Sequence, residues 1–229
     1  MKSVALGLLS SLIILGGGSA TASQPAQQIF DQVAAAYGAK PPAAIREKGT
    51  TTSFLRGNGP LLRLFKAPDK FRSEISYTSG TEVRTMVGPL AWQQQKPANT
   101  VLRGAIALQA ARIALPWNML ALRSATVDLG TATTAEGKTV QIVEFPLEPQ
   151  LKLVVDIEPE TGHILRSRGV MSLGDGAAEF VTHYSDFRRE GGRIHAGRED
   201  QFAIGQYIGY SIIDSVEYPE TMPDSAFTP

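Results

Sequence analysis

Residues 70–78 read Lys-Phe-Arg-Ser-Glu-Ile-Ser-Tyr-Thr, and this stretch decides the fold class. From Phe71 onward, apolar or small side chains alternate with polar ones, so one face of the segment is more apolar than the other. This alternation predicts a half-buried antiparallel strand. Turn-forming residues flank the stretch, Ala67-Pro68-Asp69 before it and Ser79-Gly80 after it. They indicate hairpins to a strand on either side.

The same period of two recurs along most of the chain. Further strands are expected at 46–55, 61–66, 82–87, 90–93, 126–130, 138–147, 150–157, 163–171, 178–188, 193–206 and 209–218. Their connections are short, which favours a meander of hairpins over βαβ units. Open twisted sheets rarely contain as many as roughly eleven or twelve strands without curling, so this sheet should curl. The expected fold is mainly β (α+β), an incomplete, strongly curved antiparallel barrel of about 11 strands.

Two segments have a helical pattern instead. In residues 25–36, Ile29, Phe30, Val33 and Ala36 fall on one face, which predicts an N-terminal helix. Residues 102–123 are mostly apolar at helical spacing, and Pro116 should stop or kink the helix there. We expect this second segment to be a mid-chain lid over the concave side of the sheet.

The N-terminus has the pattern of a signal peptide. Lys2 precedes an apolar run of about 12 residues, which is too short for the roughly 20 residues that span a bilayer. The small residues Ala20-Thr21-Ala22 form a cleavage site. We therefore expect residues 1–22 to be a signal peptide and 23–229 to be a single domain in the periplasm of a Gram-negative bacterium. The 22 basic and 22 acidic residues balance and are scattered, which argues against nucleic-acid binding.

No catalytic, metal or cofactor signature is present. The chain has no cysteine, which excludes disulfides, thiolate metal sites and cysteine nucleophiles. It contains no serine-hydrolase elbow, phosphate-binding loop or metal-ligand spacing. Each of the three histidines, His163, His183 and His195, is expected to be an ordinary strand or turn residue. The acids Glu144, Asp156 and Glu179 are expected to form cross-strand ion pairs with Arg166, Arg168 or Lys152.

The apolar residues of the sheet and the lid are the candidate ligand contacts. They can enclose a packed core or a cavity that accepts an acyl chain, and the pattern leaves both open. The candidate cavity and lid residues are Phe65, Phe71, Ile75, Tyr77, Trp92, Ile106, Ile113, Trp117, Leu120, Leu153 and Val155.

Several short motifs resemble the LolA/LolB-like periplasmic lipoprotein-carrier superfamily. They are the 65–72 segment Phe-Lys-Ala-Pro-Asp-Lys-Phe-Arg, the 88–92 segment Gly-Pro-Leu-Ala-Trp, the 156–164 hairpin and the 184–192 strand end. The resemblance implies an unclosed antiparallel barrel with a helical lid over a hydrophobic cavity. Carriers of this type commonly have an arginine before the proline that ties the lid to the barrel, and this chain has Ala67 there.

The leading hypothesis is a periplasmic, non-enzymatic carrier. Its partner would be a lipid or the acyl chain of a lipoprotein, with an envelope membrane protein as a possible second partner. The alternative is a protein-interaction or stress-sensing module of the envelope with a filled core. A periplasmic hydrolase is the third hypothesis, and no motif supports it.

Overall fold

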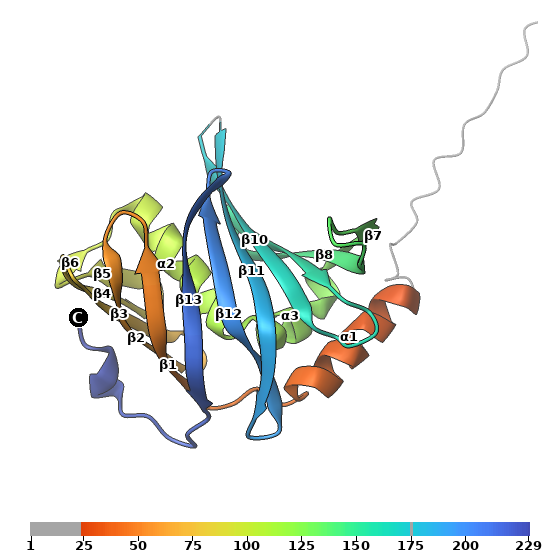
Figure 1. Ribbon diagram of the computed structural model, residues 1–229, viewed down its shortest axis with the longest axis horizontal. Helices are drawn as coiled ribbons and strands as arrows, with labels where there is room; N and C mark the ends of the chain where they lie inside the picture. The colour runs from red at the N-terminus through yellow and green to blue at the C-terminus, as the bar shows by residue number, and fades with distance from the viewer. Residues whose placement is uncertain (1–23, 175) are drawn as a thin grey trace, which may run out of the picture.

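The computed structural model describes residues 24–174 and 176–229. The predicted signal peptide lies outside these residues. Thirteen strands within them form one antiparallel sheet (Figure 1). The first six are β1 (Ala44–Ser53), β2 (Gly57–Lys66), β3 (Lys70–Tyr77), β4 (Gly80–Val87), β5 (Leu90–Gln93) and β6 (Lys96–Pro97). The others are β7 (Val127–Thr133), β8 (Thr139–Glu148), β9 (Leu151–Ile157), β10 (Ile164–Leu173), β11 (Gly176–Glu190), β12 (Arg193–Ala203) and β13 (Gln206–Glu217).

The sheet consists of two meanders, an N-terminal one from β1 to β6 and a C-terminal one from β7 to β13. The pairing of β1 with β13 joins them. The strand order is β6-β5-β4-β3-β2-β1-β13-β12-β11-β10-β9-β8-β7. Strand β1 pairs with β13, in a register that includes Arg46 opposite Glu217 and Ser53 opposite Gly209. The edge strands β6 and β7 do not pair with each other, so the sheet stays open. The predicted incomplete antiparallel barrel is confirmed, with two strands more than the expected number of about 11.

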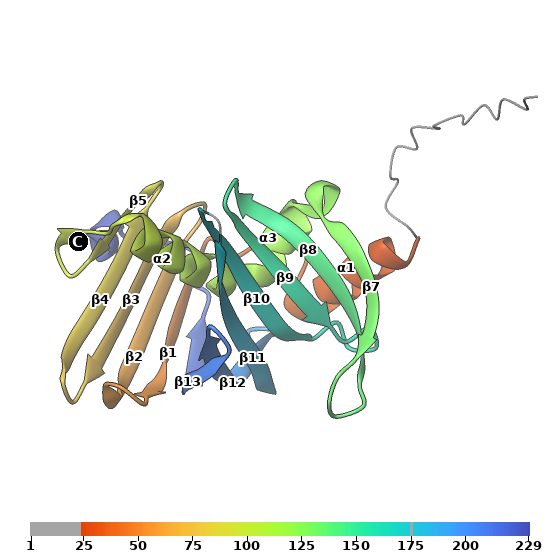
Figure 2. The ribbon, with the colours of Figure 1, turned by 90° about the horizontal axis from the view of Figure 1, so that it is seen from above.

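Helices cover one face of the curved sheet. The chain leaves edge strand β6, crosses that face in α2 (Thr100–Ile113) and α3 (Leu115–Ala121), and reaches the opposite edge strand β7 (Figure 2). Pro116 occupies the first turn of α3, and Ala114 separates the two helices. Helix α1 (Gln24–Tyr37) packs against α3 and β12. The N-terminal helix and the two-part lid therefore lie where the sequence pattern predicts them.

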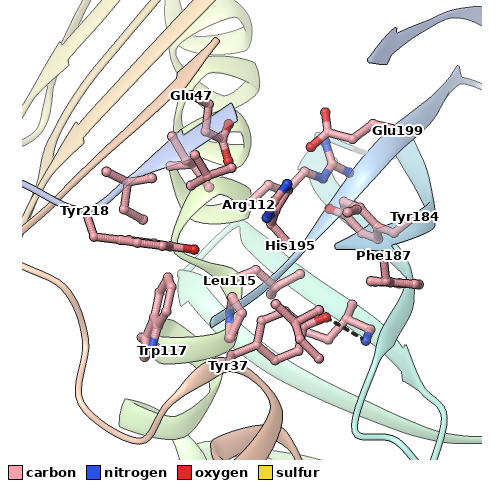
Figure 3. A pocket seen from close by; sticks show the side chains of 17 residues that line it. Tyr37, Glu47, Arg112, Leu115, Trp117, Tyr184, Phe187, His195, Glu199 and Tyr218 are labelled. Atoms are coloured by element: carbon pink, nitrogen blue, oxygen red, sulfur yellow. Dashed lines mark hydrogen bonds between the residues drawn. The ribbon is translucent and has the colours of Figure 1, made fainter. Parts of the chain in front are cut away.

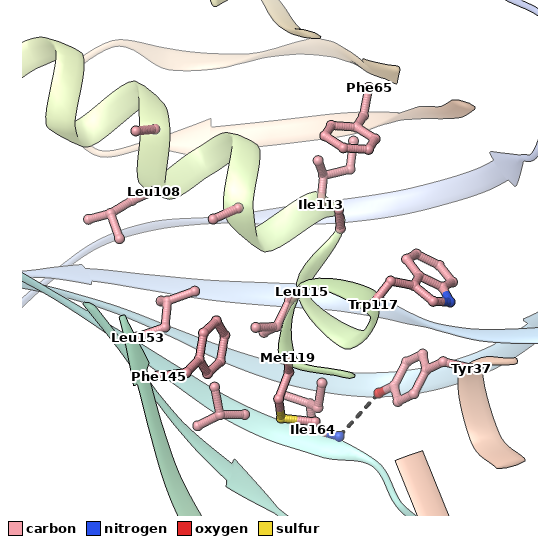
Figure 4. Close-up of a cluster of buried hydrophobic side chains, with 14 of the residues drawn as sticks. Tyr37, Phe65, Leu108, Ile113, Leu115, Trp117, Met119, Phe145, Leu153 and Ile164 are labelled. Carbon is pink, nitrogen blue, oxygen red and sulfur yellow. Dashed lines mark hydrogen bonds between the residues drawn. The ribbon is translucent and has the colours of Figure 1, made fainter. Parts of the chain in front are cut away.

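The lid packs closely on the sheet. Figure 4 shows side chains of α2 and α3 among those of the strands, and Phe145 and Leu153 are fully buried there. Gly169 of β10 permits this approach, because a Cβ at that position would lie 2.6 Å from Leu108 Cδ2 of α2. Interiors packed in this way leave few voids. No helix in the described part of the chain is long and apolar enough to cross a membrane.

Candidate functional site

A pocket interrupts this packing at the inner end of the lid. It has a volume of about 70 Å³ and lies between α1, α2, α3 and strands β1, β10, β11, β12 and β13 (Figure 3). Side chains from both meanders reach it, because β1, β13 and β12 are neighbours in the sheet. The pocket therefore depends on the pairing of the first strand with the last.

One side of the pocket is apolar and is formed by the lid. Ile113, Leu115 and Trp117 line it, and each of these side chains is buried. The indole Nε1 of Trp117 donates a hydrogen bond of 2.8 Å to the carbonyl oxygen of Gly38, at the end of α1. The guanidinium carbon of Arg193 lies 5.3 Å from the centre of the Trp117 ring, within cation–π range. These contacts hold α3 against α1 and β12.

The opposite side contains a buried ion-pair cluster. Arg63 of β2 lies between Glu47 of β1 and Glu199 of β12, with Nε–Oε2 2.8 Å and Nη2–Oε1 2.9 Å. All three side chains are almost completely buried. Burial raises the pKa of the Glu47 carboxyl to about 7, against the opposing effect of the nearby Arg63 charge. Both carboxylates thus share one cation.

A second cation, Arg112 of α2, enters the pocket from the lid. Its Nε donates to Ser167 Oγ at 3.0 Å and its Nη2 donates to the carbonyl oxygen of Phe180 at 2.6 Å. Burial lowers the pKa of the Arg112 guanidinium from its usual value. Ser167 Oγ also bonds to the hydroxyl of Tyr184 at 2.9 Å, and burial raises the pKa of Tyr184 to about 12. This network fastens the end of α2 to strands β10 and β11.

His195 of β12 completes the polar side. Its side chain is 7% exposed and faces the pocket beside Arg112 (Figure 3). Neither ring nitrogen has a hydrogen-bond partner among the described residues. Burial lowers the pKa of the imidazole, which favours its neutral form. A buried histidine without a partner differs from the general rule that buried polar groups are hydrogen-bonded.

The outer end of the lid is fastened by another arginine. Arg103 of α2 forms two parallel bonds to Glu148 of β8, Nη1–Oε2 at 2.8 Å and Nη2–Oε1 at 2.7 Å. Its Nε donates to the carbonyl oxygen of Pro89, in the turn between β4 and β5. Ala67, where carriers commonly have an arginine, is exposed. In this chain the arginines that tie the lid to the sheet come from the lid itself.

The eleven candidate contact residues lie in three kinds of surroundings: the pocket, the apolar core and positions outside the core. Ile113 and Trp117 line the pocket. Ile75 and Leu120 are partly buried and pack against the apolar core, and Tyr77 and Trp92 are partly buried outside it. The remaining five are buried core residues: Phe65, Phe71, Ile106, Leu153 and Val155. Contact of any of them with a ligand stays a prediction.

Two of the three candidate acids form the expected cross-strand ion pairs. Glu144 lies 2.8 Å from Lys152 Nζ, and Asp156 lies 2.5 Å from Arg166 Nη2. His163 stacks on Phe187 with 4.3 Å between ring centres. His183 is exposed.

The sequence interpretation missed the polar side of the pocket. Glu47, Glu199, Arg112 and His195 lie at positions that resemble the solvated residues of alternating strands or an amphipathic helix. One signal existed: Glu47 and Arg63 are opposite each other in the β1–β2 hairpin, as oppositely charged pairs often are. Glu199 and His195 come from the distant strand β12, and Arg112 comes from the lid. Only the three-dimensional structure brings them together with Glu47.

Solved structures with this fold include a member of the superfamily that the motifs resemble. A LolA superfamily protein from Nitrosomonas europaea is 12% identical with a TM-score of 0.58, covering 89% of this chain and 97% of its own. A putative outer membrane lipoprotein-sorting protein domain from Vibrio parahaemolyticus is 10% identical with a TM-score of 0.52, covering 88% and 95%. A DUF1329 family protein from Desulfovibrio piger is 11% identical with a TM-score of 0.54, covering 90% and 98%.

The resemblance to the LolA superfamily is therefore confirmed at the level of the fold. No protein-family model matches the sequence, and no curated protein matches it. At identities of 10–12%, the comparisons show the shared architecture alone. Function has to be argued from the site.

Proposed function

We propose that this protein is a periplasmic, non-enzymatic binding or carrier protein that holds a lipid or an acylated molecule beneath α2 and α3. The single observation that carries the proposal is the pocket where the apolar side chains of α3 face strands β12 and β13. Pockets for small molecules combine mostly apolar walls with a few polar groups that orient the ligand. This pocket has that composition.

An acyl chain requires the lid to move. Pockets for small molecules are typically about 300–1,000 Å³, and the volume here is about 70 Å³. Helix α3 is the part suited to move, because it has only seven residues and no side-chain cap at its N-terminus. Isolated helices of that length are unstable, so its position depends on contacts such as the Trp117–Gly38 hydrogen bond. Displacing α3 opens the space that its buried side chains Leu115 and Met119 fill.

The driving force is burial of the ligand's apolar part. Each methylene group removed from water contributes about 0.8 kcal/mol. The gain from a chain of several carbons must exceed the cost of separating α3 from the sheet. Binding and release are passive in this proposal, with no chemical step.

Native mass spectrometry of the mature protein purified from its own envelope tests the proposal. The expected spectrum contains a one-to-one non-covalent complex whose ligand is lost in organic solvent. A spectrum of ligand-free protein alone, under conditions in which added dodecanol remains bound, contradicts a resident lipid.

A second candidate function is an interaction module that binds an apolar surface of another envelope protein. The favouring observation is a group of apolar side chains at the tips of the β1–β2 and β12–β13 hairpins. Phe54, Leu55 and Ile204 are 61%, 93% and 75% exposed. Phe54 also packs edge-on against Tyr207 of the neighbouring hairpin at 5.1 Å. Exposed apolar groups of this kind mark interaction sites.

Photo-crosslinking from position 55 in the intact envelope tests this candidate. A discrete cross-linked protein species is expected from position 55, and none from the exposed position Glu160 in the β9–β10 turn. Equal cross-linking from both positions contradicts a specific docking surface.

A further inference from the structure

The unpartnered imidazole of His195 is the first sign of what the pocket binds. It is more than nine-tenths buried and it faces the pocket. At least one ring nitrogen of a histidine always carries a proton and donates. No acceptor among the described residues receives that hydrogen bond. A ligand atom that accepts it relieves the free-energy cost of a buried, unpaired donor.

The neighbouring Arg112 is a cation without an anionic partner. Its two hydrogen bonds go to a hydroxyl and to a backbone carbonyl, which are neutral groups. No ion pair joins it to a carboxylate in the described ranges of the chain. A buried positive charge whose direct hydrogen-bond partners are all neutral favours an incoming anion.

The two carboxylates near the pocket are already engaged. Glu47 and Glu199 lie 2.8 and 2.9 Å from the guanidinium nitrogens of Arg63. While Glu47 is ionised, the two carboxylates balance the charges of Arg63 and Arg112, although neither carboxylate pairs directly with Arg112. When Glu47 is protonated, one carboxylate faces two arginines, and the cluster then favours an anionic ligand over a cationic one. The raised pKa of Glu47, about 7, lets this carboxyl accept a proton near neutrality. Its protonation reduces the repulsion that an entering anion meets.

We propose that the ligand carries a carboxylate that accepts hydrogen bonds from His195 and Arg112, with its apolar chain along Ile113, Leu115 and Trp117. This inference rests on the proposed function and names its substrate class, a long-chain carboxylic acid. Charged acceptors form stronger hydrogen bonds than neutral ones, so the two contacts select for the ionised head group.

The size of the pocket agrees with this assignment. A volume of about 70 Å³ holds roughly two water-sized groups at about 30 Å³ each. The carboxylate head group fits while α3 remains in place. The rest of the chain enters the space that α3 vacates.

Calorimetric titration with two probes of equal chain length tests the inference. Dodecanoate and dodecanol, each below its aggregation concentration, are titrated into the mature protein and into Arg112→Met and His195→Leu. Arg123→Met is the matched control, because it removes an exposed arginine that follows the same lid helices.

The wild type and the control are expected to bind dodecanoate at least tenfold more tightly than dodecanol. Each pocket variant is expected to lose most of this preference while its dissociation constant for dodecanol changes less than threefold. If Arg112→Met binds neither probe, His195→Leu decides, and an unchanged preference in that variant overturns the inference.

Equal wild-type affinity for both probes overturns the carboxylate site and leaves the proposed carrier function standing. Absence of saturable binding of either probe overturns both.

Discussion

Arg103 of the lid helix α2 donates two parallel hydrogen bonds, of 2.8 and 2.7 Å, to the carboxylate of Glu148 on strand β8. The same guanidinium bonds to Pro89 O beside strand β4, at 2.8 Å. One lid residue thus connects the N-terminal meander with the C-terminal meander. The paired geometry of an arginine with a carboxylate fixes orientation as well as distance. Arg103 therefore acts as a clasp that keeps the outer end of the lid closed.

Replacing Arg103 with methionine is expected to speed ligand uptake. The substitution removes the clasp but retains most of the apolar side chain. Both partners are about 30% exposed, so the free energy of unfolding should fall by no more than about 1 kcal/mol. Stopped-flow uptake of a neutral fluorescent apolar probe should become severalfold faster. An uptake rate equal to that of Arg123→Met contradicts the assigned role.

Two candidate contact residues are expected to stabilise the core of the folded protein and not to contact a ligand. Phe71 and Leu153 are 0% exposed inside the packed core. Their replacement by alanine is expected to lower the free energy of unfolding by about 2–5 kcal/mol. Leu129→Ala, at a 50% exposed position on β7, serves as the control and should change it by less than about 0.5 kcal/mol. Urea denaturation measures each value, and a loss under 1 kcal/mol for both core variants indicates an unfilled interior.

Arg63→Met should be strongly destabilising. It leaves the buried carboxylates Glu47 and Glu199 without their shared cation. Removing one partner of a buried ion pair costs about 3–5 kcal/mol. The matched control is Arg46→Met on β1, whose exposed ion pair with Glu217 is worth about 0–1 kcal/mol. Similar melting temperatures for the two variants refute the structural importance of the cluster.

The raised pKa of Glu47 makes stability depend on pH. The folded protein holds the proton up to about pH 7, whereas the unfolded chain releases it near pH 4.5. The stabilisation from that proton is complete below pH 4.5 and is lost as the pH rises through 7. Each unit of pKa shift corresponds to about 1.4 kcal/mol.

Glu47→Gln isolates this effect, because its amide does not titrate. From pH 5 to pH 8 the wild type should lose stability relative to the variant in urea denaturation. A constant difference between the two proteins over that range shows that Glu47 has an ordinary pKa in the folded state.

The hairpin pattern of the fold could be predicted because it is local. Alternation and turn residues identify strands β3 and β5 almost to the residue. The β1–β2 hairpin is different: the strands expected at 46–55 and 61–66 leave residues 57–60, Gly-Asn-Gly-Pro, to the turn, but these residues begin strand β2. The turn instead contains the apolar residues Phe54 and Leu55. Gly59 is needed within the strand, because a Cβ there would collide with the backbone oxygen of Ser76 on β3.

The pocket could not be predicted from the same patterns. His195 alternates with Ile194 and Ala196 as any strand residue does, and no local feature shows that its side chain is buried. Its surroundings depend on the register of β12 and on where the lid ends, which are long-range relationships. Five of the eleven candidate contacts are core residues for a related reason: hydrophobicity predicts burial but does not separate a filled core from a cavity.

Titration of the Trp92→Phe variant with dodecanol tests the central claim most directly, because Trp117 is then the remaining tryptophan of the two in the chain. Trp117 lines the pocket, so its fluorescence should change and saturate at one equivalent of the alcohol. A protein that keeps its β-sheet circular dichroism but shows no saturable change in Trp117 emission contradicts a ligand-binding pocket beneath the lid.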